Sequence, residues 1–127
     1  MRAYERFLQY VKVHTTSDPT SPTHPTTLRQ FDLANKLAEE MKALGLSDVR
    51  VDEHCYVYAA IPATPGCEKA HAIGFIAHMD TTDDASGENV RPILHENYDG
   101  GDVYLPGSGD TIHVAEFPFL ADLKGQT

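Results

Sequence analysis

A histidine and an aspartate two positions apart, His78 and Asp80, are the residues of this sequence best suited to chemistry. Alternate side chains of a β-strand lie on one face, so a strand that ends here would present both side chains on the same side. A metal-ligating imidazole usually donates its second ring N–H to a carboxylate, which fixes the tautomer and the orientation of the ring. The spacing therefore predicts His78 as a metal ligand and Asp80 as the carboxylate that orients it.

The His-x-Asp pattern is short, and a histidine on an apolar strand is also common as a hydrogen-bonded core residue. The surroundings of the pair favour a site. Apolar or glycine residues at 73–77 precede it, and Thr81, Thr82, Asp83 and Asp84 follow directly. Sites in α/β proteins usually lie at the carboxyl ends of strands. We therefore expect a buried strand at 72–78 that ends in a polar loop.

Two helices are predicted before this strand. Tyr4, Phe7, Leu8 and Val11 recur at helical spacing and predict a helix over about residues 2–13. A loop at 15–27, rich in Ser, Thr and Pro, separates it from a second helix predicted over 28–44. Gly45 follows this helix at the position where a left-handed residue commonly ends one.

β-branched and aromatic residues predict strands at 49–52 and 56–61, before the strand at 72–78. Both faces of that third strand are apolar, as in an inner strand covered by helices on both sides. Shorter extended segments are predicted at 90–95, 103–105 and 112–114, and a helical turn at 117–124. The pattern predicts the α/β class with a three-layer αβα arrangement. Two helices are too few to cover both faces of such a sheet, so we expect an incomplete domain.

Composition excludes several classes of protein. A chain of 127 residues with 41% hydrophobic content is long enough for one globular domain. The net charge of −9, with ten basic residues among nineteen acidic ones, argues against a nucleic-acid partner. The N-terminus lacks the apolar segment of a secretory signal, and no apolar run reaches the length of a membrane span. We therefore expect a cytoplasmic protein without a membrane partner.

The remaining cysteines and histidines lack the spacing of metal ligands. Cys55 and Cys67 form no C-x-x-C motif, so reduced thiols are expected. The six other histidines stand in polar or turn-like segments and are expected at the surface, at positions 14, 24, 54, 71, 95 and 113. The metal prediction therefore depends on His78 alone.

The residues around the pair resemble a known family. The resemblance is carried, in order, by residues 73–81 (IGFIAHMDT), Asp84, 86–87 (SG), 89–90 (NV), 96–98 (ENY) and 100–102 (GGD). They resemble the peptidase T family, the aminotripeptidase branch of the co-catalytic zinc metallopeptidases. The resemblance implies a hydrolase that releases the N-terminal residue from short peptides, tripeptides above all, through attack of a metal-activated water on the peptide carbonyl.

The same resemblance implies that residues 1–127 are the N-terminal part of a zinc-peptidase catalytic domain. The inserted dimerisation domain and the rest of the catalytic domain would lie elsewhere. Family members hold two zinc ions with the histidine of the His-x-Asp motif, a bridging aspartate, further acidic residues and a late histidine. Here His78 matches the first ligand, and Asp80 matches the catalytic aspartate that orients the site. We therefore expect this chain alone to bind zinc weakly and to hydrolyse no peptide.

Two alternatives stay open. The chain could be a non-catalytic α/β module that assembles with a partner, or with itself, through an exposed sheet edge, because unpaired strand edges invite pairing. It could also be part of a metal-dependent amidase or deacylase on the same scaffold. Assays with tripeptide, dipeptide and N-acyl substrates distinguish these functions.

Overall fold

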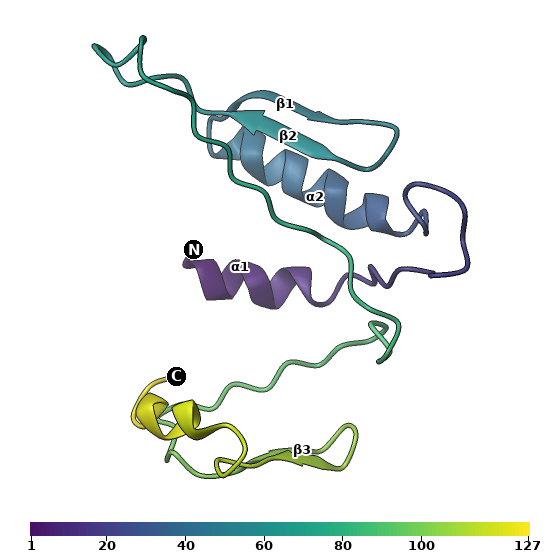
Figure 1. The fold of residues 1–127 in the computed structure, drawn as a ribbon, viewed down its shortest axis with the longest axis vertical. Helices are drawn as coiled ribbons and strands as arrows, with labels where there is room; N and C mark the ends of the chain where they lie inside the picture. The colour runs from purple at the N-terminus through teal and green to yellow at the C-terminus, as the bar shows by residue number, and fades with distance from the viewer. The chain divides into compact units, whose positions relative to one another are not determined.

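The computed structural model describes residues 1–127 and divides into two compact units, Met1–Arg91 and Pro92–Thr127. The first unit contains helices α1 (Ala3–Tyr10) and α2 (Gln30–Ala43) and the antiparallel strands β1 (Ser47–Val51) and β2 (Val57–Ala60), as Figure 1 shows. The second contains the antiparallel strands β3 (Val103–Leu105) and β4 (Asp110–Ile112) and the 3₁₀ helix η1 (Pro118–Leu123). The predicted mixture of helices and strands is thus confirmed. No helix has the length and hydropathy needed to cross a lipid bilayer.

The core of the first unit is small and lies where α2 packs against the β1–β2 hairpin (Figure 1). Its buried apolar residues are Leu33, Ala34, Ala38 and Cys55. The helix ends as predicted at Gly45, whose φ of 82° lies in the left-handed region. The N–H of Leu46 then donates to the carbonyl of Met41 at 3.1 Å, which closes the last turn.

The turn between β1 and β2 is built around Asp52. Its Oδ1 accepts the backbone N–H groups of Tyr56 at 2.9 Å and His54 at 3.0 Å. These hydrogen bonds, that of Tyr56 first, hold the pKa of Asp52 below its usual value. Cys55 occupies the tip with a φ of 67°, a conformation that non-glycine residues rarely adopt. The thiol of Cys55 is buried and that of Cys67 is exposed. Neither forms a disulfide, as predicted.

Glu40 joins the two helices. Its Oε2 accepts a hydrogen bond from the Tyr10 hydroxyl at 2.5 Å and one from Arg6 Nη1 at 2.9 Å. The Tyr10 hydroxyl first, and then the Arg6 guanidinium, hold the pKa of Glu40 below its usual value. Because α1 buries no residue completely, this polar contact is a main attachment of α1 to α2.

The predicted buried strand at 72–78 is wrong for this structure. The segment forms no strand, and the side chains of Ile73, Phe75 and Ile76 are 81, 94 and 101% exposed. A strand needs neighbours to satisfy its backbone N–H and C=O groups. Here β1 pairs only with β2 and β3 only with β4, so no strand runs beside this segment. The predicted three-layer αβα arrangement is therefore not confirmed.

The other predicted elements fare unevenly. Both helices and the strands predicted at 49–52, 56–61 and 103–105 are confirmed, with shorter bounds at most ends. The strand predicted at 112–114 forms two residues earlier, and the helical turn predicted at 117–124 is the 3₁₀ helix η1. The segment predicted at 90–95 is irregular rather than extended in a sheet.

The second unit buries no side chain fully and is closed mainly by backbone hydrogen bonds. The N–H of Tyr98 donates to the carbonyl of Gln126 at 2.8 Å, and the N–H of Gly125 donates back to the carbonyl of Tyr98 at 2.7 Å. The hydroxyl of Tyr98 also donates to the carbonyl of Gly101. These contacts hold the C-terminal residues against the segment that precedes β3.

Candidate functional site

His78 and Asp80 lie together although no strand carries them. Nδ1 of His78 lies 3.1 Å from Oδ1 of Asp80. An ionised carboxylate only accepts hydrogen bonds, so this contact requires the hydrogen of the ring to be on Nδ1. In the neutral ring Nε2 then keeps its lone pair, and it has no hydrogen-bond partner in the chain. The histidine side chain is 85% exposed, and that of Asp80 is 42% exposed.

The carboxylate of Asp80 is held from both sides. While Oδ1 faces His78, Oδ2 accepts a hydrogen bond from the hydroxyl of Ser17. The Ser17 hydroxyl is the strongest influence on this group and holds the pKa of Asp80 below its usual value, with His78 acting in the same direction and burial opposing both. Asp80 is therefore ionised at neutral pH and remains an acceptor for the imidazole.

A short parallel bridge between Thr16 and Thr81 brings Ser17 to this position. The N–H of Ser17 donates to the carbonyl of Thr81 at 3.0 Å, and the N–H of Thr81 donates to the carbonyl of Thr15 at 3.3 Å. Gly87 lies against the bridge: a Cβ atom at this glycine would come within 2.4 Å of Thr16 Oγ1. The bridge thus needs a residue without a side chain at position 87.

Ser17 and the residues that surround it were not predicted as part of the site. The loop at 15–27 looks like a connector because its Ser, Thr and Pro content is typical of turns. Nothing in the local pattern shows that its hydroxyl groups meet a segment more than sixty residues later along the chain, at Asp80.

The ring of His78 offers one exposed nitrogen with a free lone pair. The Nε2 atom of His78 is exposed, and its ring is held through Nδ1, as in an oriented metal-ligating imidazole. No group of three His, Cys, Asp or Glu side chains in the structure is placed to hold a metal ion. Zinc in proteins usually takes at least three protein ligands. The residues present therefore fit a single ligand and do not form a zinc site by themselves.

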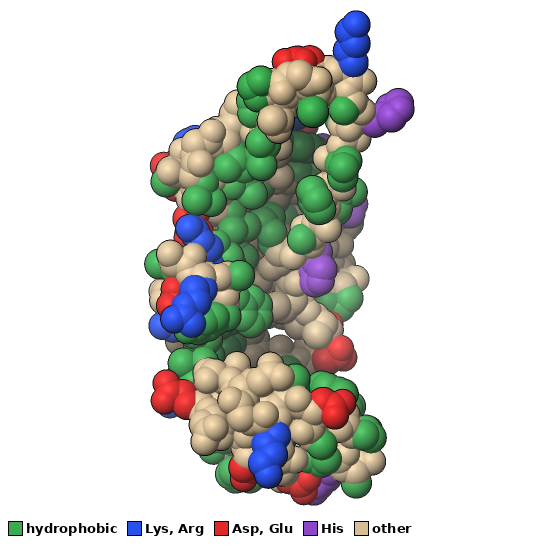
Figure 2. All heavy atoms as spheres, turned by 90° about the vertical axis from the view of Figure 1, so that its left-hand side faces the viewer, with side chains coloured by type: hydrophobic (Ala, Val, Ile, Leu, Met, Phe, Trp, Pro, Cys, Tyr) green, Lys and Arg blue, Asp and Glu red, His purple; other side chains and the backbone are tan.

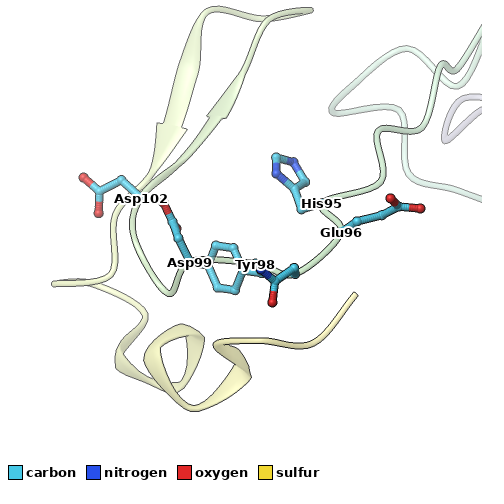
Figure 3. A pocket seen from close by; sticks show the side chains of 6 residues that line it. His95, Glu96, Tyr98, Asp99 and Asp102 are labelled. Carbon is cyan, nitrogen blue, oxygen red and sulfur yellow. The ribbon is translucent and has the colours of Figure 1, made fainter.

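The second unit has a shallow depression of about 260 Å³ lined by several ionisable residues. Figure 3 shows that the side chains of His95, Glu96 and Asp102 point in different directions and do not converge on a common point. Asp102 instead pairs with His113: Oδ2 of Asp102 lies 2.7 Å from Nδ1 of His113. This depression is therefore not built like a metal or catalytic site.

Five of the six other histidines are exposed, as predicted, and His14 is partly buried. His54 Nε2 lies 3.7 Å from Oε1 of its sequence neighbour Glu53. Two others contact residues more distant in sequence. His113 makes the pair with Asp102, and both ring nitrogens of His14 lie near Arg29 Nη1, at 2.9 and 3.1 Å. Figure 2 shows histidine side chains at the surface of the molecule beside apolar ones. The sequence spacing contains no signal for either contact.

Comparisons with known proteins address the predicted resemblance. No family model matches the chain. Curated proteins named peptidase T are similar to it over almost all of its length. The protein of Alkaliphilus oremlandii is 48% identical over 125 residues, which cover 97% of this chain and 31% of that protein. The protein of Caldanaerobacter subterraneus is 49% identical over 127 residues, covering 99% and 31%, and that of Geobacillus kaustophilus is 47% identical over 124 residues, covering 97% and 30%.

The chain spans about three tenths of the length of the curated relatives it matches. The similarity includes the segment with His78 and Asp80, since it covers 99% of the chain in one of these relatives. The predicted resemblance is thus confirmed: along almost its whole length, this chain is a sequence relative of peptidase T.

Proposed function

We propose that this chain is part of a zinc-dependent aminopeptidase that releases the N-terminal residue from short peptides, with tripeptides as the preferred substrates. The relationship to proteins named peptidase T supports a peptidase. The observation that carries the metal dependence is the contact between His78 Nδ1 and Asp80 Oδ1, which leaves Nε2 of an exposed ring free to bind a cation.

In this proposal each residue has a separate role. His78 binds the metal through Nε2, and Asp80 holds the hydrogen at Nδ1 so that the ring keeps the required tautomer. A pair of bound zinc ions would lower the pKa of a shared water to about 7 and so supply a nucleophile at neutral pH. The other ligands and the general base would come from residues outside this chain.

We also propose that the segment at 72–78 becomes an inner strand of a three-layer αβα domain in the full-length protein. Its exposed apolar side chains, with Phe75 and Ile76 almost completely accessible, support this proposal. Such side chains gain roughly 1.5–3 kcal/mol each when they are buried. Pairing on both sides of the segment would also satisfy its backbone groups.

Hydrolysis by the full-length protein tests this function. Purified protein is incubated with a tripeptide, a dipeptide and an N-acyl amino acid, each with and without a zinc chelator. We expect release of the N-terminal residue from the tripeptide and loss of that activity with the chelator. Activity on the N-acyl substrate alone would favour an amidase or deacylase, and activity that the chelator leaves unchanged would contradict the role of zinc.

The exposed apolar segment also supports a second candidate function, that of a non-catalytic module that assembles through it. Ile73, Phe75 and Ile76 lie within four residues on a segment with unpaired backbone groups, which favours pairing with a second copy. Size-exclusion chromatography of the 127-residue chain at several concentrations tests this candidate. Replacement of Phe75 by Lys should shift the chain to the monomer if this segment forms the contact. A chain that is monomeric at every concentration, or a dimer that the substitution leaves unchanged, would contradict it.

A further inference from the structure

The contacts of Asp80 continue beyond Ser17 to the start of α2. The side chain of Gln30, the first residue of that helix, is buried, with 8% of the residue exposed. Its Nε2 atom lies 3.4 Å from Ser17 Oγ and 3.3 Å from the hydroxyl oxygens of Thr26 and Thr27. A buried amide surrounded by three hydroxyl groups is part of a defined polar network rather than a solvated surface.

The network fixes the direction in which the Ser17 hydroxyl donates. The amide nitrogen of Gln30 shares its two hydrogens among three hydroxyl oxygens, and in its contact with Ser17 Oγ it can only be the donor. A serine hydroxyl has one hydrogen, and the ionised carboxylate of Asp80 can take it because a carboxylate only accepts. The order of donation therefore runs from Gln30 to Ser17 and from Ser17 to Asp80.

The same carboxylate then determines the tautomer of His78. With Oδ2 bonded to Ser17, the plane of the carboxylate is fixed, and Oδ1 faces Nδ1 of the ring at 3.1 Å. A carboxylate attached at one oxygen to a partly buried network presents its other oxygen in a defined direction. Without that attachment Asp80, which is partly exposed, can rotate and exchange the imidazole contact for water.

We propose that Ser17 is a positioning residue that acts through Asp80 to keep the hydrogen of His78 on Nδ1 and its Nε2 free to accept. Its significance for catalysis rests on the proposed function, because that function gives the Nε2 lone pair its role. The effect on the ring is a property of this chain and is measurable without any bound metal. Gln30 belongs to the same network, since its side-chain amide donates to the oxygen of the Ser17 hydroxyl.

Nuclear magnetic resonance of the histidine ring nitrogens tests the proposal directly. The ¹⁵N-labelled 127-residue chain is examined at one alkaline pH, at which histidines are neutral, so that the tautomer rather than the charge is measured. We expect the Nδ1–H form of His78 to predominate in the unmodified chain. Ser17→Ala should lower the ratio of Nδ1–H to Nε2–H by about two- to fivefold, which is less than the full contribution of a hydrogen bond to a charged group, because the lost bond acts on the ring only through Asp80.

Two further variants separate positioning from folding. Ser17→Thr retains a hydroxyl and should restore most of the Nδ1–H population. Ser17→Cys keeps the size of the side chain with a weaker donor and should give an intermediate ratio. The backbone amide signals of Ser17 and Thr81 report whether the parallel bridge is intact in each variant. If Ser17→Ala disturbs those signals, the proposal is tested instead by comparing the tautomer ratio of His78 in the Thr and Cys variants.

An unchanged tautomer ratio in Ser17→Ala with an intact bridge, or equal ratios in the Thr and Cys variants, would overturn the proposal. A ring of His78 that is mainly Nε2–H in the unmodified chain would do so as well. These outcomes are distinct from failure of the proposed function. Absence of peptide hydrolysis by the full-length protein would reject the aminopeptidase while leaving the measured effect of Ser17 on the ring in place.

Discussion

His78 divides its two ring nitrogens between two roles. Nδ1 is used by the contact with Asp80, and Nε2 is left to solvent. Because Asp80 is itself bonded to Ser17, the direction of the ring depends on residues that lie far apart in sequence. The chemistry of the site therefore begins with the hydrogen bonds of one carboxylate rather than with the imidazole alone.

A second histidine–aspartate pair, His113 with Asp102, gives a prediction for pH dependence in the second unit. The Asp102 carboxylate raises the pKa of His113, and the His113 ring, followed by the N–H of Val114, lowers the pKa of Asp102. The stabilisation that comes from protonated His113 is complete below the pKa of an unfolded histidine, about 6.5. It is lost as the pH rises through the raised pKa of His113 in the folded chain. The stabilisation that comes from ionised Asp102 is complete above the pKa of an unfolded aspartate, about 3.9. It is lost as the pH falls through the lowered pKa of Asp102 in the folded chain.

The contact should therefore be strongest between about pH 4 and 6.5. Hydrogen exchange of the Val114 amide, which donates to Asp102 Oδ1 at 2.8 Å, measures it after correction for the intrinsic pH dependence of exchange. We expect protection to fall on both sides of this window. His113→Gln should abolish the loss on the alkaline side. Protection that keeps rising through neutral pH would contradict the role of this pair.

Gly87 gives a steric prediction at the bridge beside the site. Ala at this position would place its Cβ 2.4 Å from Thr16 Oγ1 and 3.1 Å from Thr81 Oγ1. Overpacking of this kind costs about 1–3 kcal/mol, so Gly87→Ala should lower the free energy of unfolding of the first unit. Gly74→Ala is the matched control, because a Cβ there meets nothing within 4 Å. Urea denaturation compares the two; equal stabilities would show that the bridge tolerates a side chain.

At the level of secondary structure, the attachment of α1 depends on Glu40. Glu40→Ala removes the acceptor of both Tyr10 and Arg6 and should lower the free energy of unfolding by about 1–2 kcal/mol, as expected for hydrogen bonds to a charged group. Glu39→Ala on the same helix removes only an exposed pair with Lys42 and should change stability by less than about 0.5 kcal/mol. Similar effects of the two substitutions in thermal unfolding would contradict the assigned role of Glu40.

The elements that could be predicted are those whose stability is local or comes from near neighbours. The second helix carries its own apolar face and its Gly45 end, and β1 and β2 are joined by a short turn around Asp52. The segment at 72–78 has the composition of an inner strand but depends entirely on partners distant in sequence, and this chain provides none beside it. The apolar pattern of the segment therefore shows that it is suited to be an inner strand. Whether a strand forms depends on neighbouring strands with which it can pair.

In the candidate site, too, only the contact between residues close in sequence could be predicted. His78 and Asp80 are two residues apart, and the structure brings them together as the spacing predicts. Ser17 and Gln30 were not predicted, because a hydroxyl in a loop and an amide at the start of a helix have no distinctive spacing with respect to Asp80. Their contribution arises only from the bridge between Thr16 and Thr81.

Considered as a whole molecule, the chain contains one part of the proposed chemistry. It spans about three tenths of the length of relatives named peptidase T, and no three of its potential ligand side chains come together around a metal position. The exposed Phe75 and Ile76 lie three and two residues before His78, so the same segment contains both an apolar surface suited to pairing and the proposed ligand. Completion of the sheet and completion of the metal site are thus expected to occur together.

The central claim is that His78 ligates the catalytic metal, and substitution in the full-length protein tests it most directly. His78→Asn and the control His71→Asn, which replaces an exposed histidine without hydrogen bonds, are compared for bound zinc and for tripeptide hydrolysis. Loss of a partner that is hydrogen-bonded to a metal ligand typically costs about 10–100-fold in metal affinity or activity. Because His78→Asn removes the proposed ligand itself, we predict a loss of turnover of about 100-fold together with loss of part of the bound zinc, while His71→Asn keeps both. Unchanged zinc content and unchanged turnover in His78→Asn would contradict the account.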